Sequence, residues 1–142
     1  MKTLISAIAT LLIFLSITSC EKDDNPINCD IEVVISADEY STAPNDELTI
    51  NSLEINENCL TVNFSSGGCS GDTWELKLID AAIILESNPP QRNLRLSLKN
   101  EESCLAYITK EITFDISELQ IDGNKVLLNI VNSGDQILFE YE

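Results

Sequence analysis

Apolar and polar residues alternate with a period of two along most of the chain beyond residue 30. Leu60, Val62 and Phe64 show the pattern most clearly, because each is followed by a polar residue. This period is typical of a β-strand that buries one face. The same pattern recurs at residues 74–78, 94–98, 112–116 and 137–141. The chain therefore carries five clearly predicted strands.

Four weaker stretches also favour strands, at residues 31–35, 48–56, 105–109 and 126–131. The last is apolar enough to lie inside a sheet with both faces covered. In the second, the apolar phase slips by one residue at Asn51-Ser52, which predicts a β-bulge or two separate strands. Residues 80–86 are ambiguous, because Asp-Ala-Ala-Ile-Ile-Leu fits either two helical turns or a continued strand.

Turn residues separate these strands. Asp-Gly-Asn at 122–124 and Ser-Gly-Asp at 133–135 predict two hairpin connections, and hence an antiparallel meander in the C-terminal third. Residues 88–91 contain two prolines and predict a loop. Many short strands with such turns favour an all-β fold: a single antiparallel β-sandwich domain over residues 30–142, in preference to a closed barrel.

Residues 1–19 form a predicted signal peptide that does not belong to the folded domain. The segment begins with a cation at Lys2, continues with an apolar run from Leu4 to Ile17 and ends in small residues. The run has 14 residues, whereas a helix needs about 20 to span a bilayer. We therefore expect cleavage rather than a permanent helical anchor.

The end of this segment, Ile17-Thr18-Ser19-Cys20, resembles the bacterial lipobox, in which an aliphatic residue and two small residues precede an acylated cysteine. The resemblance implies that Cys20 carries fatty-acyl chains such as palmitate and becomes the mature N-terminus. Several chains give stable membrane attachment, whereas a single one binds marginally. An ordinary signal peptide that releases a soluble protein is the alternative.

Residues 20–29 are predicted to be the lipidated N-terminus and a polar tether, because they contain too few apolar residues to fold. The segment Glu21-Lys22-Asp23-Asp24 resembles the surface-export signal of Bacteroidetes-type lipoproteins. This resemblance implies a lipid-anchored protein of the outer membrane that is exposed at the cell surface. A charged flexible spacer is the alternative interpretation of this segment. The sequence is compatible with a domain at either leaflet of the outer membrane.

Four cysteines follow Cys20: Cys29, Cys59, Cys69 and Cys104. Their even number in an exported protein predicts two disulfides. Of three possible connectivities we favour Cys29 with Cys59 and Cys69 with Cys104, because both pairs close local loops without nesting. A four-thiolate zinc site is disfavoured, because such sites use closely spaced pairs and the nearest cysteines here are ten residues apart. We expect no bound metal.

The predicted mature protein is strongly acidic. All 24 Asp and Glu residues follow Cys20, and seven Lys and Arg residues remain once Lys2 is removed, which gives a formal charge of −17. A field of this sign repels phosphates and anionic head groups, so we expect no nucleic-acid partner. The negative charge is compatible with a basic protein, a cation or a neutral molecule as the ligand. Much of this charge is expected to keep the domain soluble.

The chain contains no histidine. It therefore lacks the usual general base near neutral pH, and the Ser-His-Asp and Cys-His mechanisms are excluded. Two carboxylates would suffice for glycoside hydrolysis, but in a chain with 24 acids such a pair carries no information. We expect a protein that is not an enzyme and has no cofactor, with a carboxylate-dependent glycosidase as a remote alternative.

Residues 65–72 form the glycine-rich cluster Ser-Ser-Gly-Gly-Cys-Ser-Gly-Asp. Backbone amides in such a cluster can cradle an anion, but the Lys-Ser/Thr ending of a P-loop is absent. We therefore predict a sharp turn between two strands, anchored by a disulfide. Asp122 and Asn124 lack the ladder spacing of a calcium loop and are also predicted to form a turn.

Two aromatic residues, Trp74 and Tyr107, are candidates for a sugar-binding platform. Trp74 shares its strand face with Leu76, and Tyr107 shares one with Leu105. Core packing is therefore the favoured prediction for both rings. Tyr40 lies in a polar stretch and is predicted to be the exposed aromatic residue.

The region from Cys59 to Glu142 resembles small, uncharacterised secreted lipoproteins of the same bacterial group. The resemblance rests on Gly67-Gly68-Cys69, on residues 86–91, and on Cys104 followed by residues 112–116. It implies the Cys69 to Cys104 bridge and a shared β fold, and it implies no activity.

The favoured hypothesis is a lipid-anchored binding or accessory protein of the cell envelope, with a protein or glycan partner. The alternative is an acidic inhibitor or structural lipoprotein that masks a basic partner. An apolar groove lined by an aromatic residue would favour the first, and a contiguous acidic face the second. A cleft that holds two acids of unequal pKa would favour the glycosidase.

Overall fold

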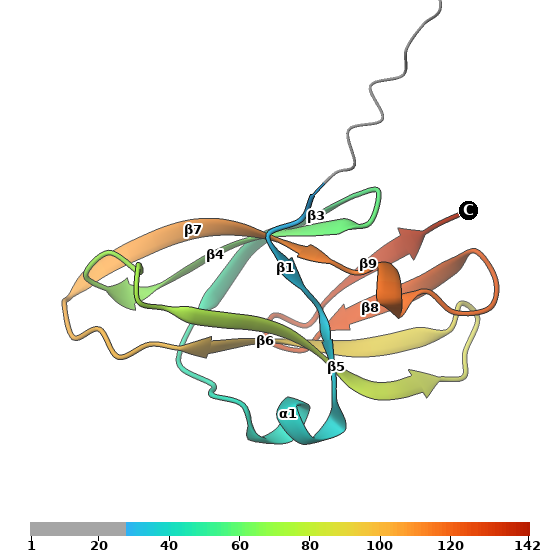
Figure 1. Cartoon of the computed structure of the whole chain (residues 1–142), viewed down its shortest axis with the longest axis horizontal. Coiled ribbons are helices and arrows are strands. Elements are labelled where there is room, and N and C mark those ends of the chain that lie inside the picture. The colour runs from blue at the N-terminus through green and yellow to red at the C-terminus, as the bar shows by residue number, and fades with distance from the viewer. Residues whose placement is uncertain (1–27) are drawn as a thin grey trace, which may run out of the picture.

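The computed structural model describes residues 28–142, which form two β-sheets packed face to face (Figure 1). The predicted all-β sandwich is confirmed. The elements are β1 (Ile31–Glu32), β2 (Val34–Ile35), α1 (Ala37–Thr42), β3 (Thr49–Asn56), β4 (Cys59–Gly68), β5 (Glu75–Leu85), β6 (Gln91–Lys99), β7 (Ala106–Asp115), the 3₁₀ helix η1 (Ser117–Leu119), β8 (Lys125–Ile130) and β9 (Asp135–Glu140).

The first sheet has the strand order β1-β7-β4-β3, and the second β2-β5-β6-β8-β9. Strand β4 pairs with β7 along its whole length and with β3 on its other side. Three pairings are parallel, β1 with β7, β2 with β5 and β6 with β8. Both sheets are therefore mixed, whereas the sequence predicted an antiparallel sandwich. The parallel neighbours come from distant parts of the chain, and local alternation does not encode such pairings.

The predicted meander of the C-terminal third is only partly correct. The hairpin between β8 and β9, around Gly134, is present. Strand β7, however, belongs to the first sheet and β8 to the second, so the turn around Gly123 follows η1 and leads into β8 without closing a hairpin. Residues 105–109 and 112–116, predicted as two strands, lie largely in the single strand β7.

The N-terminal segment passes from one sheet to the other, as Figure 1 shows. Strand β1 pairs with β7, β2 pairs with β5, and the buried Val33 lies between them. The backbone N–H of Val33 donates to the carbonyl of Asp115, and that of Ser36 donates to the carbonyl of Asp80. This crossing closes one side of the sandwich, whereas the edge strands β3 and β9 bound the other.

The short helix α1 lies where the sequence pattern predicts none. Ser36 caps its start, because Ser36 Oγ accepts a hydrogen bond from the backbone N–H of Glu39. Arg95 of β6 donates to carbonyl oxygens of the helix and its C-terminal end, those of Glu39, Tyr40 and Ala43. A cation is favourable there, because the last carbonyls of a helix lack helical partners.

The ambiguous stretch 80–86 continues strand β5 as far as Leu85. The register against β6 shifts between Asp80 and Ile84, and Ala82 in this bulge has a φ of 57°. The backbone N–H of Ala82 donates to Asp80 Oδ1 at 2.8 Å, so a buried carboxylate supports the bulge. The bulge predicted in residues 48–56 is also present, within β3.

The core lies between the sheets and follows the predicted alternation. Leu60, Val62 and Phe64 of β4 point inward and are almost fully buried. Their partners on the other strands include Leu78, Leu94, Leu96, Phe114, Val126, Leu128 and Phe139. Full burial of a side chain of this size contributes about 1.5 to 3 kcal/mol to the stability of the fold. This core is therefore the main source of stability of the sandwich.

Both predicted disulfides are present, Cys29–Cys59 and Cys69–Cys104. They lie at opposite ends of β4, because Cys59 is its first residue and Cys69 directly follows its last. Disulfides indicate an oxidising, extracytoplasmic compartment. The predicted signal peptide, the lipidation site Cys20 and the tether up to residue 27 lie outside the described residues. Among residues 28–142, no helix has the length and apolar character needed to cross a membrane.

Candidate functional site

A groove of about 420 Å³ lies at the end of the sandwich where β4 ends and β7 begins. Residues 47–49 form one side, residues 65–67 the floor, and Asn100 with residues 102–104 the other side. Tyr107 completes the lining. Polar side chains and the tyrosine ring therefore share one cavity, which is more polar than the apolar groove expected for a binding protein.

Tyr107 is exposed in this groove, so the prediction that it packs in the core is wrong. The exposed fraction of the residue is 67%. Tyr107 lies opposite Gly67 in the register of β4 and β7, and because glycine has no side chain, the neighbouring strand leaves the ring uncovered. The Tyr107 hydroxyl donates to Thr49 Oγ1 at 3.0 Å, which fixes the orientation of the ring.

Tyr40 and Trp74 are both covered by other side chains. Tyr40, predicted to be exposed, is partly buried, with the guanidinium of Arg95 5.9 Å from its ring centroid, and burial raises the pKa of its hydroxyl. Trp74 packs against the core as predicted, with its ring centroid 5.9 Å from that of Phe64. Tyr107 is therefore the ring that a ligand in the groove would contact.

Hydrogen bonds hold the polar side chains of the groove floor. Ser66 Oγ donates to the carbonyl of Glu47 at 2.6 Å. Asn100 Nδ2 donates to the carbonyl of Gly67 at 2.6 Å and to Ser66 Oγ at 3.4 Å. Asn100 Oδ1 accepts from the backbone N–H of Glu102 at 2.9 Å. These bonds fix the polar atoms in advance, which lowers the entropy lost when a ligand binds.

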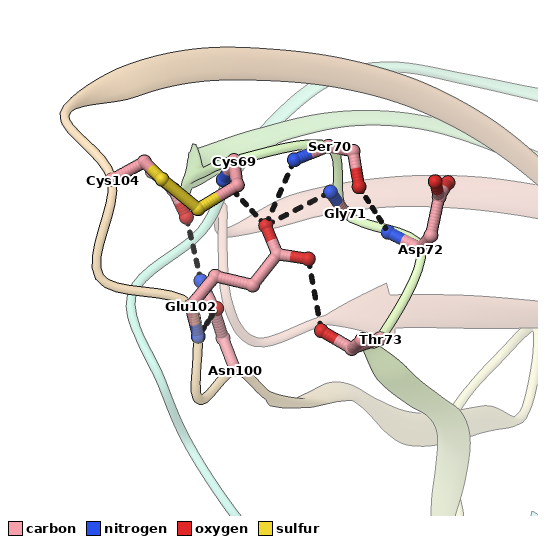
Figure 2. The surroundings of a disulfide bond; sticks show 9 residues. Cys69, Ser70, Gly71, Asp72, Thr73, Asn100, Glu102 and Cys104 are labelled. Carbon is pink, nitrogen blue, oxygen red and sulfur yellow. Dashed lines mark hydrogen bonds between the residues drawn. A yellow bond between two sulfur atoms is a disulfide. The ribbon is translucent and has the colours of Figure 1, made fainter.

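A carboxylate holds the loop that follows β4 (Figure 2). Glu102 Oε2 accepts hydrogen bonds from the backbone amides of Cys69, Ser70 and Gly71 at 2.5, 3.0 and 3.0 Å, and Oε1 accepts from the hydroxyl of Thr73 at 2.9 Å. The Gly71 amide is the largest contributor to the lowering of the Glu102 pKa to about 2. Hydrogen bonds to a carboxylate favour its charged form.

The glycine-rich cluster therefore forms the predicted turn and also binds an anion, which is a carboxylate of the same chain. Because Glu102 occupies these amides, they do not offer a free phosphate site. The Cys69–Cys104 disulfide closes the same loop, as Figure 2 shows. Sequence reasoning missed Glu102, because 31 positions separate it from Gly71 and no local pattern marks it.

Gly71 meets two constraints in this loop. Its φ is 71°, a left-handed conformation that favours glycine. A Cβ atom at this position would also lie 2.7 Å from Lys110 Cε and 3.0 Å from the Trp74 ring. Lys110 Nζ lies 5.8 Å from the centroid of that ring and 3.1 Å from Asp72 Oδ1. The loop thus packs closely against side chains of β7 and the residue before β5.

Hydrogen-bonded polar side chains extend from the groove across the outer face of the first sheet. We call Asn51, Asn63, Ser65, Thr109 and Glu111 the outer polar row. Asn51 Nδ2 donates to Asn63 Oδ1 at 2.9 Å and to Ser65 Oγ at 2.8 Å. Ser65 Oγ lies 2.7 Å from Thr109 Oγ1, and Asn63 Nδ2 donates to Glu111 Oε2 at 3.4 Å. The row links β3, β4 and β7, and Ser65 also lines the groove.

A buried ion pair stabilises the second sheet, away from the groove. Arg92 Nη1 lies 2.9 Å from Asp80 Oδ1, and both side chains are more than nine-tenths buried. Burial raises the pKa of Asp80, while the charge of Arg92 opposes the rise. The pair joins β5 to β6 next to the β5 bulge, so its role is structural.

Two carboxylates line the groove, those of Glu47 and Glu102. In the described part of the chain, no group of three or more His, Cys, Asp and Glu side chains is arranged to hold a metal ion. Asp122 and Asn124 are exposed in the turn before β8. A pKa of about 2 keeps Glu102 ionised at neutral pH, where it cannot act as a general acid.

The fold is similar to that of two proteins of known structure, from Bacteroides vulgatus and Parabacteroides distasonis. The first is a DUF1344 protein of unknown function, with 20% sequence identity and a TM-score of 0.51. The second is provisionally described as toxin-related, with 16% identity and a TM-score of 0.54. Both matches cover 79% of this chain, which spans 56% and 60% of the two proteins. At these identities the likeness shows the fold alone.

The chain matches no protein-family model and no curated protein.

Proposed function

We propose that this protein is a lipid-anchored binding protein of the cell envelope that holds a neutral glycan in the Tyr107 groove. The observation that carries the proposal is the exposed ring of Tyr107 above a floor of fixed hydroxyl and amide groups. A sugar ring has apolar C–H faces and a rim of hydroxyls, so it matches an aromatic ring beside hydrogen-bonding groups.

The charge of the groove supports a neutral ligand over an anionic one. Glu47 and Glu102 line the groove, and the described lining contains no Lys or Arg side chain. An anionic sugar or a phosphate would meet like charges there. A carboxylate such as Glu47 can instead accept hydrogen bonds from sugar hydroxyls.

The position of the groove supports a role for an anchored protein. The chain enters the domain at Cys29, which is joined to the first residue of β4, whereas the groove lies at the last residues of β4. Ten residues of extended strand separate these ends, a distance of about 30 Å. A lipid anchor at Cys20 would then leave the groove at the end away from the tether.

The test is a carbohydrate array probed with the purified full-length protein in detergent, followed by calorimetric titration of the best neutral oligosaccharide. Tyr107→Ala should weaken binding about tenfold or more, because the stacking surface is lost, and Tyr107→Phe should retain most of the affinity. Leu138→Ala is the matched control, since Leu138 is exposed on β9 of the other sheet. No binding on the array, or equal binding by Tyr107→Ala, would overturn the proposal.

A second candidate function is the masking of a basic protein, and the pairing of the cations favours it. Lys77, Lys99 and Lys110 lie within 3.1 Å of carboxylates of the same chain. Most other surface acids among residues 28–142 therefore have no basic neighbour, and they would attract a basic partner. Binding of this kind should weaken steeply between low and physiological salt, whereas binding of a neutral glycan should not.

A further inference from the structure

We propose that the glycan is a linear, uncharged chain that continues from the Tyr107 groove along the outer polar row, so that the site holds several sugar units. This inference rests on the proposed function and adds the class and length of the ligand. The observation that carries it is the continuity of the groove and the row at Ser65, which lines the groove and contacts Thr109 at 2.7 Å.

The strand geometry provides a straight path. Tyr107, Thr109, Glu111 and Thr113 occupy alternate positions of β7, on the face opposite the buried Phe114. Four residue steps separate Tyr107 from Glu111, a length of about 13 Å, and Thr113 lies two steps further along the strand. This stretch of β7 is paired without a register shift to β4, so it forms a continuous platform wider than a single sugar ring.

The chemistry of the row selects a polyhydroxylated chain. Its amide, hydroxyl and carboxylate groups are mutually hydrogen-bonded. Ser65 is buried, but Asn51, Thr109 and Glu111 are exposed and retain donor or acceptor capacity, such as the second oxygen of Glu111. The row contains no cation to attract an acidic polymer. It also contains no apolar side chain, whereas an extended peptide would need pockets for alternate side chains. A neutral glycan needs neither a cation nor apolar pockets, so it fits this row.

The far end of the path is also fixed. Asp30 Oδ2 accepts hydrogen bonds from the Thr113 backbone N–H at 2.9 Å and from the Thr113 hydroxyl at 2.7 Å. These bonds lower the pKa of Asp30, so the carboxylate is ionised and occupied by the chain itself. The available polar path therefore runs from Tyr107 to Glu111, and Thr113 marks its end.

The experiment measures affinity against chain length. The full-length protein is titrated with neutral oligosaccharides from disaccharide to hexasaccharide, taken from β-glucan, α-glucan, mannan and xylan series. In the series that binds, the hexasaccharide should bind about tenfold tighter than the disaccharide. The double variant Asn63→Ala and Glu111→Ala should lose this difference while keeping the disaccharide affinity, because neither side chain lines the groove or makes a hydrogen bond to a residue that does.

Two controls separate the possible failures. Asn93→Ala removes a similar amide hydrogen bond from the outer face of the other sheet, where Asn129 Nδ2 donates to Asn93 Oδ1 at 2.9 Å, and it should change no affinity. Thermal unfolding verifies that each variant is folded. Affinity that does not rise with chain length, or a rise that survives in the double variant, would overturn this inference alone. Failure of every oligosaccharide to bind would overturn the proposed function as well.

Discussion

Glu102 Oε2 accepts a hydrogen bond from the backbone amide of Gly71 at 3.0 Å, in a loop that a disulfide also closes. The carboxylate thus satisfies amides that a glycine-rich turn would otherwise leave to solvent. Because Glu102 and Cys104 themselves line the groove, the position of this groove wall depends on the hydrogen bonds of Glu102 as well as on the covalent bridge.

Replacement Glu102→Gln should reduce stability at neutral pH, because a neutral amide accepts weaker hydrogen bonds than a carboxylate. The folded-state pKa of about 2 lies below the usual value of 4.5. The stabilising contribution is therefore fully present above about pH 4.5 and is lost as the pH falls towards 2. The melting temperature of the wild type should fall more steeply across this window than that of the variant.

The control for this change is Glu54→Gln, which removes an exposed carboxylate from β3. It should leave both the neutral-pH melting temperature and the acid profile of the wild type almost unchanged. Parallel acid profiles for wild type and Glu102→Gln would contradict the assigned role of the carboxylate.

Replacement Arg92→Met should destabilise the fold strongly, because it leaves the fully buried Asp80 without its cation. Breaking a buried pair on one side costs about 3 to 5 kcal/mol. Lys77→Met is the control, since the Lys77–Glu39 pair is exposed and contributes less than about 1 kcal/mol. Denaturant unfolding measures the loss of unfolding free energy in both variants. Similar losses would show that the buried Asp80–Arg92 pair stabilises the fold no more than an exposed pair does.

Replacement Gly71→Ala should cost more stability than Gly134→Ala, although both glycines have a positive φ, of 71° and 77°. The left-handed conformation costs a residue with a Cβ about 1 to 2 kcal/mol at either site. At Gly71 the new Cβ would also meet Lys110 and Trp74, whereas at Gly134 nothing lies within 4 Å. Equal unfolding free energies for the two variants would mean that the loop around Gly71 relaxes freely.

Alternation predicted the strands and the core well, because burial of one face imposes a period of two on each strand. It failed at Tyr107 for a definite reason. We predicted residues 105–109 as a separate strand and grouped Tyr107 with Leu105, but Leu105 precedes β7. In the single strand β7, Tyr107 is out of phase with the buried Phe114 and therefore faces outward.

The rest of the site could not be predicted from local patterns. The partner of Glu102 lies 31 positions away, and Asn51 and Asn63 meet only because β3 and β4 pair. The parallel pairing of β6 with β8 likewise joins segments from different parts of the chain. Such contacts depend on strand order, which turn residues indicate only for hairpins such as β8 and β9.

The two disulfides should affect opposite ends of the molecule, because they lie at the two ends of β4. Each closes a loop of about the same size, with sequence separations of 30 and 35, so removal of either should cost about 4 kcal/mol. The double variant Cys69→Ser and Cys104→Ser should speed hydrogen exchange at residues 69–71 and weaken ligand binding in the groove. The double variant Cys29→Ser and Cys59→Ser should instead speed hydrogen exchange at residues 30–33. In this variant the exchange rates at residues 69–71 should stay as slow as in the wild type. Hydrogen exchange followed by mass spectrometry distinguishes the two, and faster exchange at residues 69–71 in both variants would show that the ends of β4 unfold as one unit.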